Sequence, residues 1–369
     1  MKFSIAKDQF ASGLQSVQNI VSSRTTLPIL SNVLLRAEGD RLDLTVTDLD
    51  VTIQCDVSAT VSRPGTVTLP VKKLFSIVRE LGSPELEVEV DDRSVCSLRA
   101  GPSFFKINGL PAEEYPPVPE FEEQRIVAMP QEVLGSMLRK TSFAVSTDET
   151  RYVLNGLFFS LKEHKITLVA TDGRRLALTD EEAEIDGESQ REFIVPTKAV
   201  VELQRLLHDK GQVEVRATEN QVAFMLLGED GHRAQLISKL VEGTYPNYQQ
   251  VIPKESKERI TLIREELLLA LRRAEIMTSD KANSVKLSFS RNQLSITANS
   301  PDVGEARENL AVNYKGGDFG VAFNPTFLLD ALKALAEEEV FFELTDELSP
   351  GVLKINGPFL YVIMPMRMN

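Results

Sequence analysis

The chain has 369 residues, 42% hydrophobic and 26% charged, which is enough for two or three ordinary domains. It has no apolar run of 18 residues and no basic N-terminus followed by an apolar stretch, so we expect neither a membrane nor an exported protein but a cytoplasmic one. The net charge of −13 argues against a tight, nonspecific nucleic-acid binder, because such proteins normally carry a basic excess.

The first third of the chain predicts an α+β fold. It begins with a helical pattern of apolar residues over positions 7–21. Strict alternation of apolar and polar residues over positions 42–57 then predicts two antiparallel strands that meet at Thr47-Asp48. A second helical pattern follows Pro70 and covers positions 72–81. Two helices on antiparallel sheet are therefore expected.

The same order of elements recurs in the middle of the chain. Helical patterns cover positions 131–141 and 198–208, and the second follows Pro196. Between them, the alternation over positions 166–178 predicts a strand pair around Thr171-Asp172. The middle of the chain is therefore a second copy of the first unit.

A third copy completes the chain, with helical patterns over positions 265–275 and 326–336 and a strand pair over 294–310. Its proline, Pro325, lies 129 residues after Pro196, which itself lies 126 after Pro70. This period is too long for a solenoid unit, so each copy should be a complete fold.

Proline-rich stretches that we expect to be extended, at 115–119 and 245–253, separate the copies. We predict three repeated domains of antiparallel sheet with two helices each, at residues 1–122, 123–254 and 255–369.

Signs of catalysis are few. The chain has three histidines and no HExxH, GxSxG, GxxxxGK[ST] or GxGxxG pattern. The pair Asp48 and Asp50, and the group Asp172, Arg174 and Arg175, suit either a carboxylate or phosphate site or the turn of a hairpin. Their recurrence at one strand junction favours the turn. Two cysteines, Cys55 and Cys96, lack CxxC spacing, so we expect buried thiols and no metal or cofactor.

The predicted helices are slightly basic within an acidic chain, which fits either solvated helix faces or a surface that faces nucleic acid. A domain of this length is about 35 Å wide, so three in a ring leave a gap of about 5 Å and six leave about 35 Å. Duplex DNA is about 20 Å across. A single chain cannot surround DNA, whereas a head-to-tail pair can.

Four phrases of the sequence resemble the bacterial DNA polymerase III beta subunit, the replicative sliding clamp: TLPILSNVLL at 26–35, RYVLNG at 151–156, VATDGRRLA at 169–177 and MPMR at 364–367. The resemblance covers the whole chain. It implies a non-enzymatic, head-to-tail homodimeric ring of six domains that encircles duplex DNA independently of sequence. Such a ring holds the DNA polymerase III catalytic subunit and confers processivity in DNA replication. A clamp loader opens it, and other replication and repair proteins bind it through short peptide motifs.

The resemblance also implies three sets of functional residues. The partner-peptide residues are Leu154, Thr171, Gly173, Arg174, Arg175, Leu176, Pro246, Val251, Asn324, Phe327, Val362, Ile363, Met364, Pro365, Met366 and Arg367. The DNA-facing residues are Arg24, Lys73, Arg79, Arg151, Tyr152, Lys198 and Arg205. The dimer-interface residues are Phe105 and Ile107 against Ile276 and Met277, with Glu305 and Glu308 offering charge to the opposite first domain.

The chain departs from the family pattern at Gln250, Ala282 and Phe327 and in its Met368-Asn369 ending. The methionines of the C-terminal segment suit either core filling or an adaptable peptide-binding surface. Two rival functions are a repeat-built scaffold that binds proteins without encircling DNA, and an enzyme with its active site between the domains.

Overall fold

The computed structural model describes residues 1–21, 27–118, 121, 126–185, 190–229, 231–279 and 283–367. Its contacts divide the chain into two compact units. The first unit comprises Met1–Gly135 and Lys198–Leu240, and the second comprises Ser136–Thr197 and Val241–Asn369. Each unit therefore combines parts of two consecutive predicted domains, and the middle predicted domain contributes to both.

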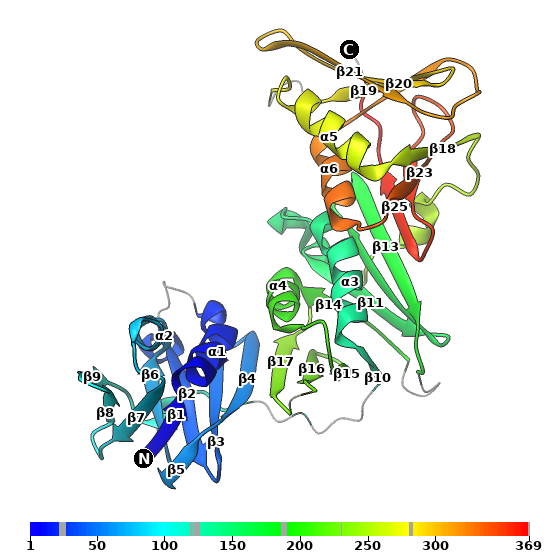
Figure 1. Cartoon of the computed structure of the whole chain (residues 1–369). Helices are drawn as coiled ribbons and strands as arrows, with labels where there is room; N and C mark the ends of the chain where they lie inside the picture. The colour runs from blue at the N-terminus through cyan, green and yellow to red at the C-terminus, as the bar shows by residue number, and fades with distance from the viewer. Residues whose placement is uncertain are drawn as a thin grey trace. The chain divides into compact units, whose positions relative to one another are not determined.

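The described residues contain six α-helices, two per predicted domain, which confirms the predicted pattern (Figure 1). The α-helix predicted over 7–21 ends earlier, at Val17, because Gln18–Ile20 form a short 3-10 helix, η1. The bounds are α1 Lys7–Val17, α2 Val71–Glu80, α3 Gln131–Thr141, α4 Thr197–Leu206, α5 Arg264–Glu275 and α6 Pro325–Ala334.

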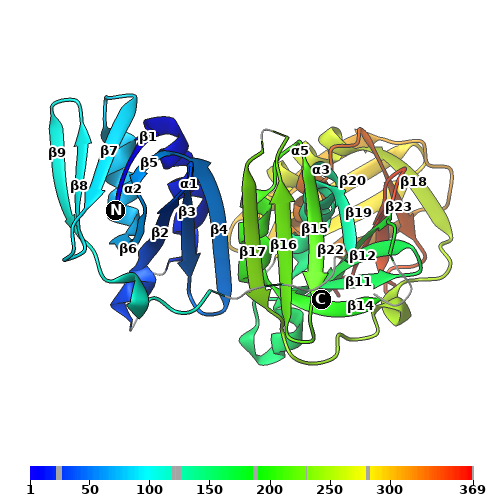
Figure 2. The same cartoon turned by 90° about the horizontal axis from the view of Figure 1, so that it is seen from below.

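The first unit contains two antiparallel sheets. The five-stranded sheet has the order β5 (Thr60–Arg63), β1 (Lys2–Ala6), β7 (Glu85–Val90), β8 (Val95–Ala100), β9 (Ser103–Asn108). The eight-stranded sheet has the order β10 (Val127–Pro130), β15 (Gln212–Ala217), β16 (Gln221–Leu227), β17 (Arg233–Lys239), β4 (Val51–Ser58), β3 (Arg41–Thr47), β2 (Asn32–Glu38), β6 (Gly65–Pro70). Figure 2 shows β15, β16 and β17 side by side.

The second unit has a matching pair of sheets. The eight-stranded sheet has the order β14 (Arg191–Pro196), β11 (Gly156–Lys162), β12 (Lys165–Thr171), β13 (Arg175–Glu182), β25 (Phe359–Ile363), β24 (Gly351–Lys354), β23 (Glu339–Leu344), β18 (Glu258–Ile263). The four-stranded sheet has the order β21 (Gly304–Ala311), β20 (Gln293–Ser300), β19 (Val285–Ser290), β22 (Phe319–Phe323).

Each predicted domain runs twice through the order strand, helix, three strands, with β5 as an addition in the first domain. Four of the six strands that come third after a helix form the junctions between domains. In the first unit β17 pairs with β4, and in the second unit β13 pairs with β25, both antiparallel. These junctions explain why the compact units cut across the middle domain.

The helices bury one apolar stripe each. In α1 this stripe contains Phe10, Leu14 and Val17, which are fully buried, and the helix contacts β3 and β4. Burial of one such side chain contributes about 1.5–3 kcal/mol. Polar residues on the other face stay in water, so the sequence periodicity sets which helix face meets the sheet.

The expectation of extended linkers is only partly correct. Tyr248–Val251, inside the stretch 245–253, form the 3-10 helix η7. The side chain of Asn247 accepts a hydrogen bond from the Gln249 N–H at 3.2 Å, and this cap starts the helical turn.

Among the described residues, no helix has the length and apolar composition needed to cross a membrane.

Candidate functional site

The predicted partner-peptide residues all lie in the second unit, and a tight turn between β12 and β13 positions several of them. The Thr171 hydroxyl donates to the Arg175 carbonyl at 2.6 Å and accepts from the Gly173 N–H at 3.1 Å. The Asp172 carboxylate accepts the backbone N–H groups of Arg174 and Arg175. Gly173 has φ +83°, a conformation that glycine adopts without steric cost.

The corresponding turn of the first domain is built in the same way. The Asp48 carboxylate accepts the N–H groups of Asp50 and Val51, and Thr47 Oγ1 accepts from the Leu49 N–H. Leu49 occupies the place of Gly173, with φ +80°. These aspartates therefore have the turn-forming role that the repetition in the sequence favoured.

Arg175 connects the turn to the last helix. Its guanidinium contacts the Asp172 carboxylate at 3.0 Å and that of Asp330 on α6 at 2.7 Å, and it donates to the Phe143 carbonyl at 2.8 Å. Its Cζ lies 4.4 Å from the ring centroid of Phe327, a cation–π contact. Burial lowers the pKa of Arg175, but the surrounding phenol of Tyr361 and the two carboxylates outweigh it and raise the pKa. Arg175 is therefore a charged link between β13 and α6.

The first unit contains a counterpart of this link, made by a different residue. The ammonium of Lys198, at the start of α4, forms an ion pair with Asp48 and donates to the Ile20 carbonyl at 3.3 Å. In both units a cation pairs with the turn aspartate and donates to a carbonyl of a short 3-10 helix, Gln18–Ile20 in the first unit and Ser142–Ala144 in the second. The two cations occupy different positions of the repeat, since Phe327 stands at the position of Lys198.

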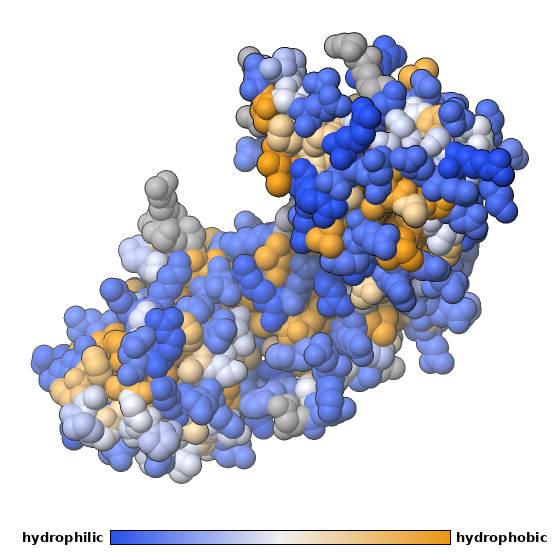
Figure 3. Space-filling view, turned by 45° about the horizontal axis from the view of Figure 1, so that its top comes forward, coloured by the Kyte–Doolittle hydropathy of each residue, from blue (hydrophilic) through white to orange (hydrophobic). Residues whose placement is uncertain are grey.

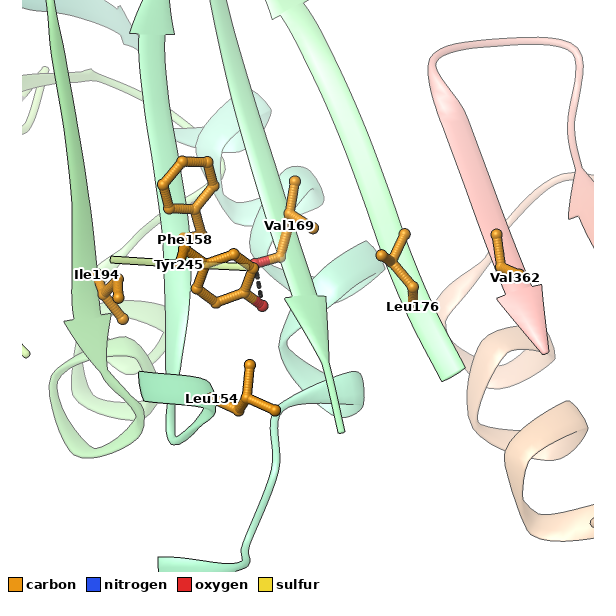
Figure 4. Close-up of a cluster of buried hydrophobic side chains, with 7 residues drawn as sticks. All are labelled: Leu154, Phe158, Val169, Leu176, Ile194, Tyr245 and Val362. Carbon is orange, nitrogen blue, oxygen red and sulfur yellow. Dashed lines mark hydrogen bonds between the residues drawn. The ribbon is translucent and has the colours of Figure 1, made fainter. Parts of the chain in front are cut away.

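A buried apolar cluster contains three of the predicted partner residues (Figure 4). They are Leu154, Leu176 and Val362, which are between 2% and 7% exposed. The other members are Phe158, Val169, Ile194 and Tyr245. The structure thus brings predicted residues from three separate segments of the chain into one cluster.

Tyr245 is the clearest functional candidate that the sequence reasoning missed. Its ring stacks on Phe158, with centroids 4.8 Å apart, and its hydroxyl donates to the Val169 carbonyl at 3.5 Å. Burial raises the pKa of Tyr245, so the phenol stays protonated at neutral pH. The sequence did contain a signal, because Tyr115 and Tyr245 both precede a proline at equivalent positions. Their hydroxyls donate to carbonyls of equivalent strands, Thr45 of β3 and Val169 of β12.

Three other predicted partner residues are exposed apolar side chains. Val251 is 51% exposed, Met364 45% and Met366 38%. The Met364 N–H donates to the Arg174 carbonyl at 2.9 Å, which attaches the C-terminal segment to the turn. Exposure of two methionines favours the adaptable surface over core filling. On the face in Figure 3, hydrophilic residues cover most of the surface and apolar residues form separate patches.

The remaining predicted partner residues have mixed roles. Asn324 caps α6, with its side-chain oxygen accepting from the Thr326 N–H at 2.9 Å. Ile363 is buried, Pro365 is half-buried, and Pro246 and Arg367 are exposed. Ala282 and the Met368-Asn369 ending lie outside the described residues.

The predicted DNA-facing residues lie on or beside short helices. Lys73 on α2 is exposed and forms no ion pair with a described residue. Arg79, also on α2, contacts Glu80 at 3.1 Å, and Arg205 on α4 pairs with the buried Glu202. Burial raises the pKa of Glu202, and Arg205 opposes this shift. Arg24 lies outside the described residues.

Two further DNA-facing candidates follow each other in the 3-10 helix η5 (Glu149–Leu154). Arg151 contacts the Asp148 carboxylate at 3.0 Å and donates to the Asp172 carbonyl at 2.9 Å. Part of its guanidinium is therefore bound to the turn between β12 and β13. Tyr152 is 58% exposed. Lys198 is engaged by Asp48, whereas Lys73 and Tyr152 are exposed.

The predicted interface residues lie on two edge strands and at the end of α5. Phe105 on β9 is 36% exposed and Ile107 is buried at 8%. Ile276 is 74% exposed, and Met277 follows it. Glu305 is exposed on β21, and it contacts Arg307 at 3.4 Å.

Glu308, the last predicted interface residue, already has a cation in its own chain. Its two carboxylate oxygens accept from Nε and Nη2 of Arg273 at 3.0 and 2.8 Å. These hydrogen bonds hold the pKa of Glu308 below its usual range. Glu308 therefore offers less free charge to a partner than Glu305 does.

The thiols of Cys55 and Cys96 are free, and burial raises the pKa of both to about 12. Neither is a reactive thiolate at neutral pH. Across the part of the chain that the structure describes, no group of three or more His, Cys, Asp or Glu residues is arranged to hold a metal ion.

Comparison with protein families gives matches along nearly the whole chain. The models of the N-terminal, central and C-terminal domains of the DNA polymerase III beta subunit match residues 1–119, 128–247 and 249–367. Similar curated proteins include the beta sliding clamps of Chlamydia pneumoniae and Pseudomonas putida, each 35% identical, and of Bacillus subtilis, 32% identical. Each match covers 100% of both chains.

Solved structures agree with these matches. The sliding clamp of Pseudomonas aeruginosa bound to griselimycin is 34% identical with a TM-score of 0.93. The sliding clamp of Bacillus subtilis is 32% identical, also with a TM-score of 0.93. Both comparisons cover 100% of each chain.

Proposed function

Because the chain belongs to the DNA polymerase III beta subunit family, we propose that it is a DNA sliding clamp, a non-catalytic subunit that encircles duplex DNA and holds the replicative polymerase there. The observation that carries the proposal is similarity over the full length of both chains to proteins named beta sliding clamp. The family matches also support three domains at 1–122, 123–254 and 255–369. A clamp of the replication machinery acts in the cytoplasm.

The strand pairing supports a head-to-tail homodimer. Among the described elements, each of the six helices is followed by three strands, and the third strand is the one that can join two domains. Four of these six third strands pair with each other, in the junctions β17·β4 and β13·β25. The remaining two, β9 and β21, each end a sheet. We propose that β9 of one copy pairs with β21 of the other, which gives two identical junctions and a ring of six domains.

The register of this pairing can be transferred from the known junctions. Ser238 lies opposite Val51, and Ile363 lies opposite Arg175. The equivalent positions at the ends of the chain are Ile107 and Gly304, so Phe105 should lie opposite Ala306 and Lys106 opposite Glu305. The exposed ring of Phe105 would then be covered by the second copy, together with Ile276 and Met277.

Cross-linking tests this register. With Phe105→Cys and Ala306→Cys in one chain, oxidation should join two copies at both junctions, because directly opposed residues have Cβ atoms about 5 Å apart. The control pair Phe105→Cys with Glu308→Cys is displaced by one two-residue step and should cross-link much less. The wild-type protein controls for Cys55 and Cys96. Equal cross-linking of both pairs would overturn the register.

Enclosure explains attachment without tight binding. Each neutralised phosphate releases counterions and strengthens binding, so a strongly basic lining would hold the protein at one position. A few cations, such as Lys73 and Arg79, contact the DNA backbone weakly and permit sliding. The acidic remainder of the chain opposes binding of further DNA to the outside.

The surface around Leu154, Leu176 and Val362 is the proposed docking site for short extended peptides. Its apolar floor anchors side chains, and Val251, Met364 and Met366 at its edge adapt to different sequences. The expected users are the DNA polymerase III catalytic subunit, the clamp loader and other replication and repair proteins. Docking raises the effective concentration of the polymerase at the primer end.

Loading onto DNA circles tests the function. Protein loaded by a clamp loader onto nicked circular DNA should co-elute with the circle and should be lost after the circle is cut, because it slides off the free ends. Retention after linearisation would contradict enclosure. Binding of the polymerase peptide without retention on circles would instead support the protein-binding scaffold.

A further inference from the structure

The first unit contains a groove that the proposed clamp function does not use. Its volume is about 1020 Å³, and it lies between the eight-stranded sheet and the linker that follows the first domain. Leu44 and Val57 lie beside Gly13 of α1, so the alternate residues of β3 and β4 point to the other face of the sheet, into the groove. Strands β2, β3, β4, β17, β16 and β15 form the sheet wall, and Ala112, residues 115–118 and Phe121 form the linker wall.

The equivalent linker of the second unit packs on apolar side chains. Its residues Tyr245, Tyr248 and Ile252 pack in or against the buried cluster of Figure 4. In the first unit, Tyr115 keeps the position of Tyr245 and donates to the Thr45 carbonyl at 3.2 Å. The sheet beside it, however, is polar at three equivalent positions, with Thr45 in place of Val169, Gln54 in place of Leu178 and Gln235 in place of Leu360. The sheet wall of the groove can therefore bind polar groups.

Four charged side chains form a row across neighbouring strands of the sheet wall. Arg36 on β2 lies opposite Asp43 on β3, and Asp43 lies opposite Asp56 on β4. Arg233 on β17 comes next, and its N–H donates to the Asp56 carboxylate at 3.2 Å. All four residues line the groove. The row therefore presents a cation, two anions and a second cation, in that order.

These charges are not neutralised within the row. Arg36 and Arg233 are exposed, and neither guanidinium forms an ion pair with a described residue. Asp56 contacts Arg41 at 3.7 Å, whereas the half-buried carboxylate of Asp43 has no ion pair within the described part of the chain. Burial raises the pKa of Asp43, and the charge of Asp56 raises it further, because like charges on directly opposed residues repel. A cation between the two carboxylates would relieve this repulsion.

Two glutamines of the sheet wall have hydrogen-bonding groups to offer. Gln54 and Gln235 lie directly opposite each other, and both are half-buried. The side chain of Gln235 forms no hydrogen bond with a described residue, and that of Gln54 donates only to Thr45 Oγ1, at 3.4 Å. A carboxamide offers donors and an acceptor together, so this pair can bind the N–H and C=O groups of an extended main chain.

We propose that the groove binds an extended segment of a partner protein in which acidic, apolar, basic, apolar and acidic residues follow one another. Alternate side chains of an extended chain point the same way, and four residues span about 13 Å. Arg36 and Arg233 are three strands apart, about 14 Å, so the two acidic residues can meet both guanidinium groups. The basic residue between them then lies over Asp43 and Asp56, where a cation is favoured.

The linker wall and the glutamines complete the fit. The apolar residues of the segment face the half-buried side chains of Pro116, Val118 and Phe121. Gln54 and Gln235 bind its main chain. Every residue of the groove lies in the first unit, whereas the predicted partner-peptide residues all lie in the second. The segment therefore binds at a place of its own and does not compete with the polymerase peptide.

A labelled peptide of the sequence GELKLEG is the probe. GKLELKG is its matched control, because it has the same length and apolar residues but the inverted charge pattern. Fluorescence anisotropy with the full-length protein should show saturable binding of the probe and at least tenfold weaker binding of the control. The chain carries a net charge of −13, so nonspecific attraction favours the control and cannot produce this preference.

Variants of the charged row locate the binding. Asp43→Asn removes one central carboxylate and should weaken binding of the probe about fivefold. Arg36→Gln combined with Arg233→Gln removes both outer cations and should weaken it about tenfold. The controls are Asp40→Asn and Arg93→Gln, which change exposed residues of the first unit outside the groove and should bind like the wild type.

Thermal unfolding should show that all of these variants are folded, and an unlabelled polymerase peptide should not displace the probe. Four results would each overturn the proposal: no saturable binding of the probe, equal binding of the two peptides, wild-type affinity of the row variants, or displacement by the polymerase peptide. Loading on circular DNA is measured in parallel, so that failure of the groove is distinguishable from failure of the clamp function.

Discussion

Arg175 and Asp330 form an ion pair with 2.7 Å between Nη1 and Oδ2, and this contact connects strand β13 of the second domain with helix α6 of the third. Only 9% of the Arg175 side chain is exposed, against 27% of that of Asp330. The same guanidinium packs on Phe327, which belongs to the predicted peptide surface. Stability of the junction and shape of the peptide surface therefore depend on one side chain.

Arg175→Met should lower the free energy of unfolding of the second unit by about 3 kcal/mol, because it leaves the carboxylates of Asp172 and Asp330 without their cation. Urea denaturation followed by circular dichroism measures this change. Arg174→Met removes the exposed neighbouring cation and should change stability by less than about 0.5 kcal/mol. Similar losses for the two variants would show that the Arg175 contacts contribute little.

Met364→Asp should weaken binding of the polymerase peptide at least tenfold, because it places a charge on the apolar peptide surface. The side chain is 45% exposed, so folding should be unaffected. Fluorescence anisotropy with a labelled peptide measures the affinity. Leu348→Asp changes another exposed apolar residue of the third domain, which lies outside the predicted peptide surface. This control should leave the peptide affinity unchanged. A wild-type affinity of Met364→Asp would exclude this residue from the surface.

Ile276→Asp combined with Met277→Asp should give monomers, because two charges in an apolar junction are costly when the second copy covers them. Sedimentation velocity measures the mass. The matched control is Leu269→Asp, which changes an exposed leucine of the preceding helix α5 and should leave the dimer intact. A dimer in the double variant would refute the proposed interface.

Lys73 and Lys198 should respond differently to substitution although both were predicted to face DNA. Lys73→Glu should shorten retention on circular DNA without changing the unfolding midpoint, since Lys73 is exposed. Lys198→Met should lower stability by at most about 1 kcal/mol, because its ion pair with Asp48 is partly exposed. Retention on DNA and thermal unfolding, measured on both variants, separate the two roles. A stability loss only in Lys73→Glu would reverse this assignment.

Asp43→Asn should stabilise the first unit at neutral pH. Burial raises the pKa of Asp43, and the carboxylate of Asp56 on the facing strand raises it further. When the folded-state pKa of a carboxyl group is raised, the group favours folding at pH values below its unfolded-state pKa, near 3.9. At pH values above the raised folded-state pKa, its buried charge opposes folding. The stability gained by Asp43→Asn should therefore decrease as the pH falls from above the raised pKa to below the unfolded-state pKa. Thermal unfolding between pH 3 and 7 measures it, with exposed Asp40→Asn as the control.

Much of the fold could be predicted because it depends on local patterns that occur three times. The helix α3 (Gln131–Thr141) matches its predicted window, and the strand pair around Asp172 lies where the alternation indicated. A single pattern of this kind is ambiguous, but three copies at one spacing exclude accidental periodicity. The role of Asp172 in a turn was predictable for the same reason.

The division into compact units was not predictable in the same way. Repetition indicated three domains, but β17 pairs with β4 and β13 pairs with β25, so each eight-stranded sheet joins two copies. Strand partners depend on contacts between residues far apart in the sequence, and periodicity carries no information about them. The packing of Phe158 and Tyr245 with Leu154, Leu176 and Val362 follows from these same contacts.

The sequence by itself determined the element order, the threefold repeat, the turn chemistry of Asp48 and Asp172, and the family, because each of these depends on residue type and spacing along the chain. Only the tertiary structure decided which cations are free and which are engaged. Lys198 and Arg175 look like ordinary surface cations in the sequence, yet each contacts a turn aspartate and a carbonyl of a short 3-10 helix. That outcome depends on the distance between side chains from different elements, which is fixed when the sheets pair across the domains.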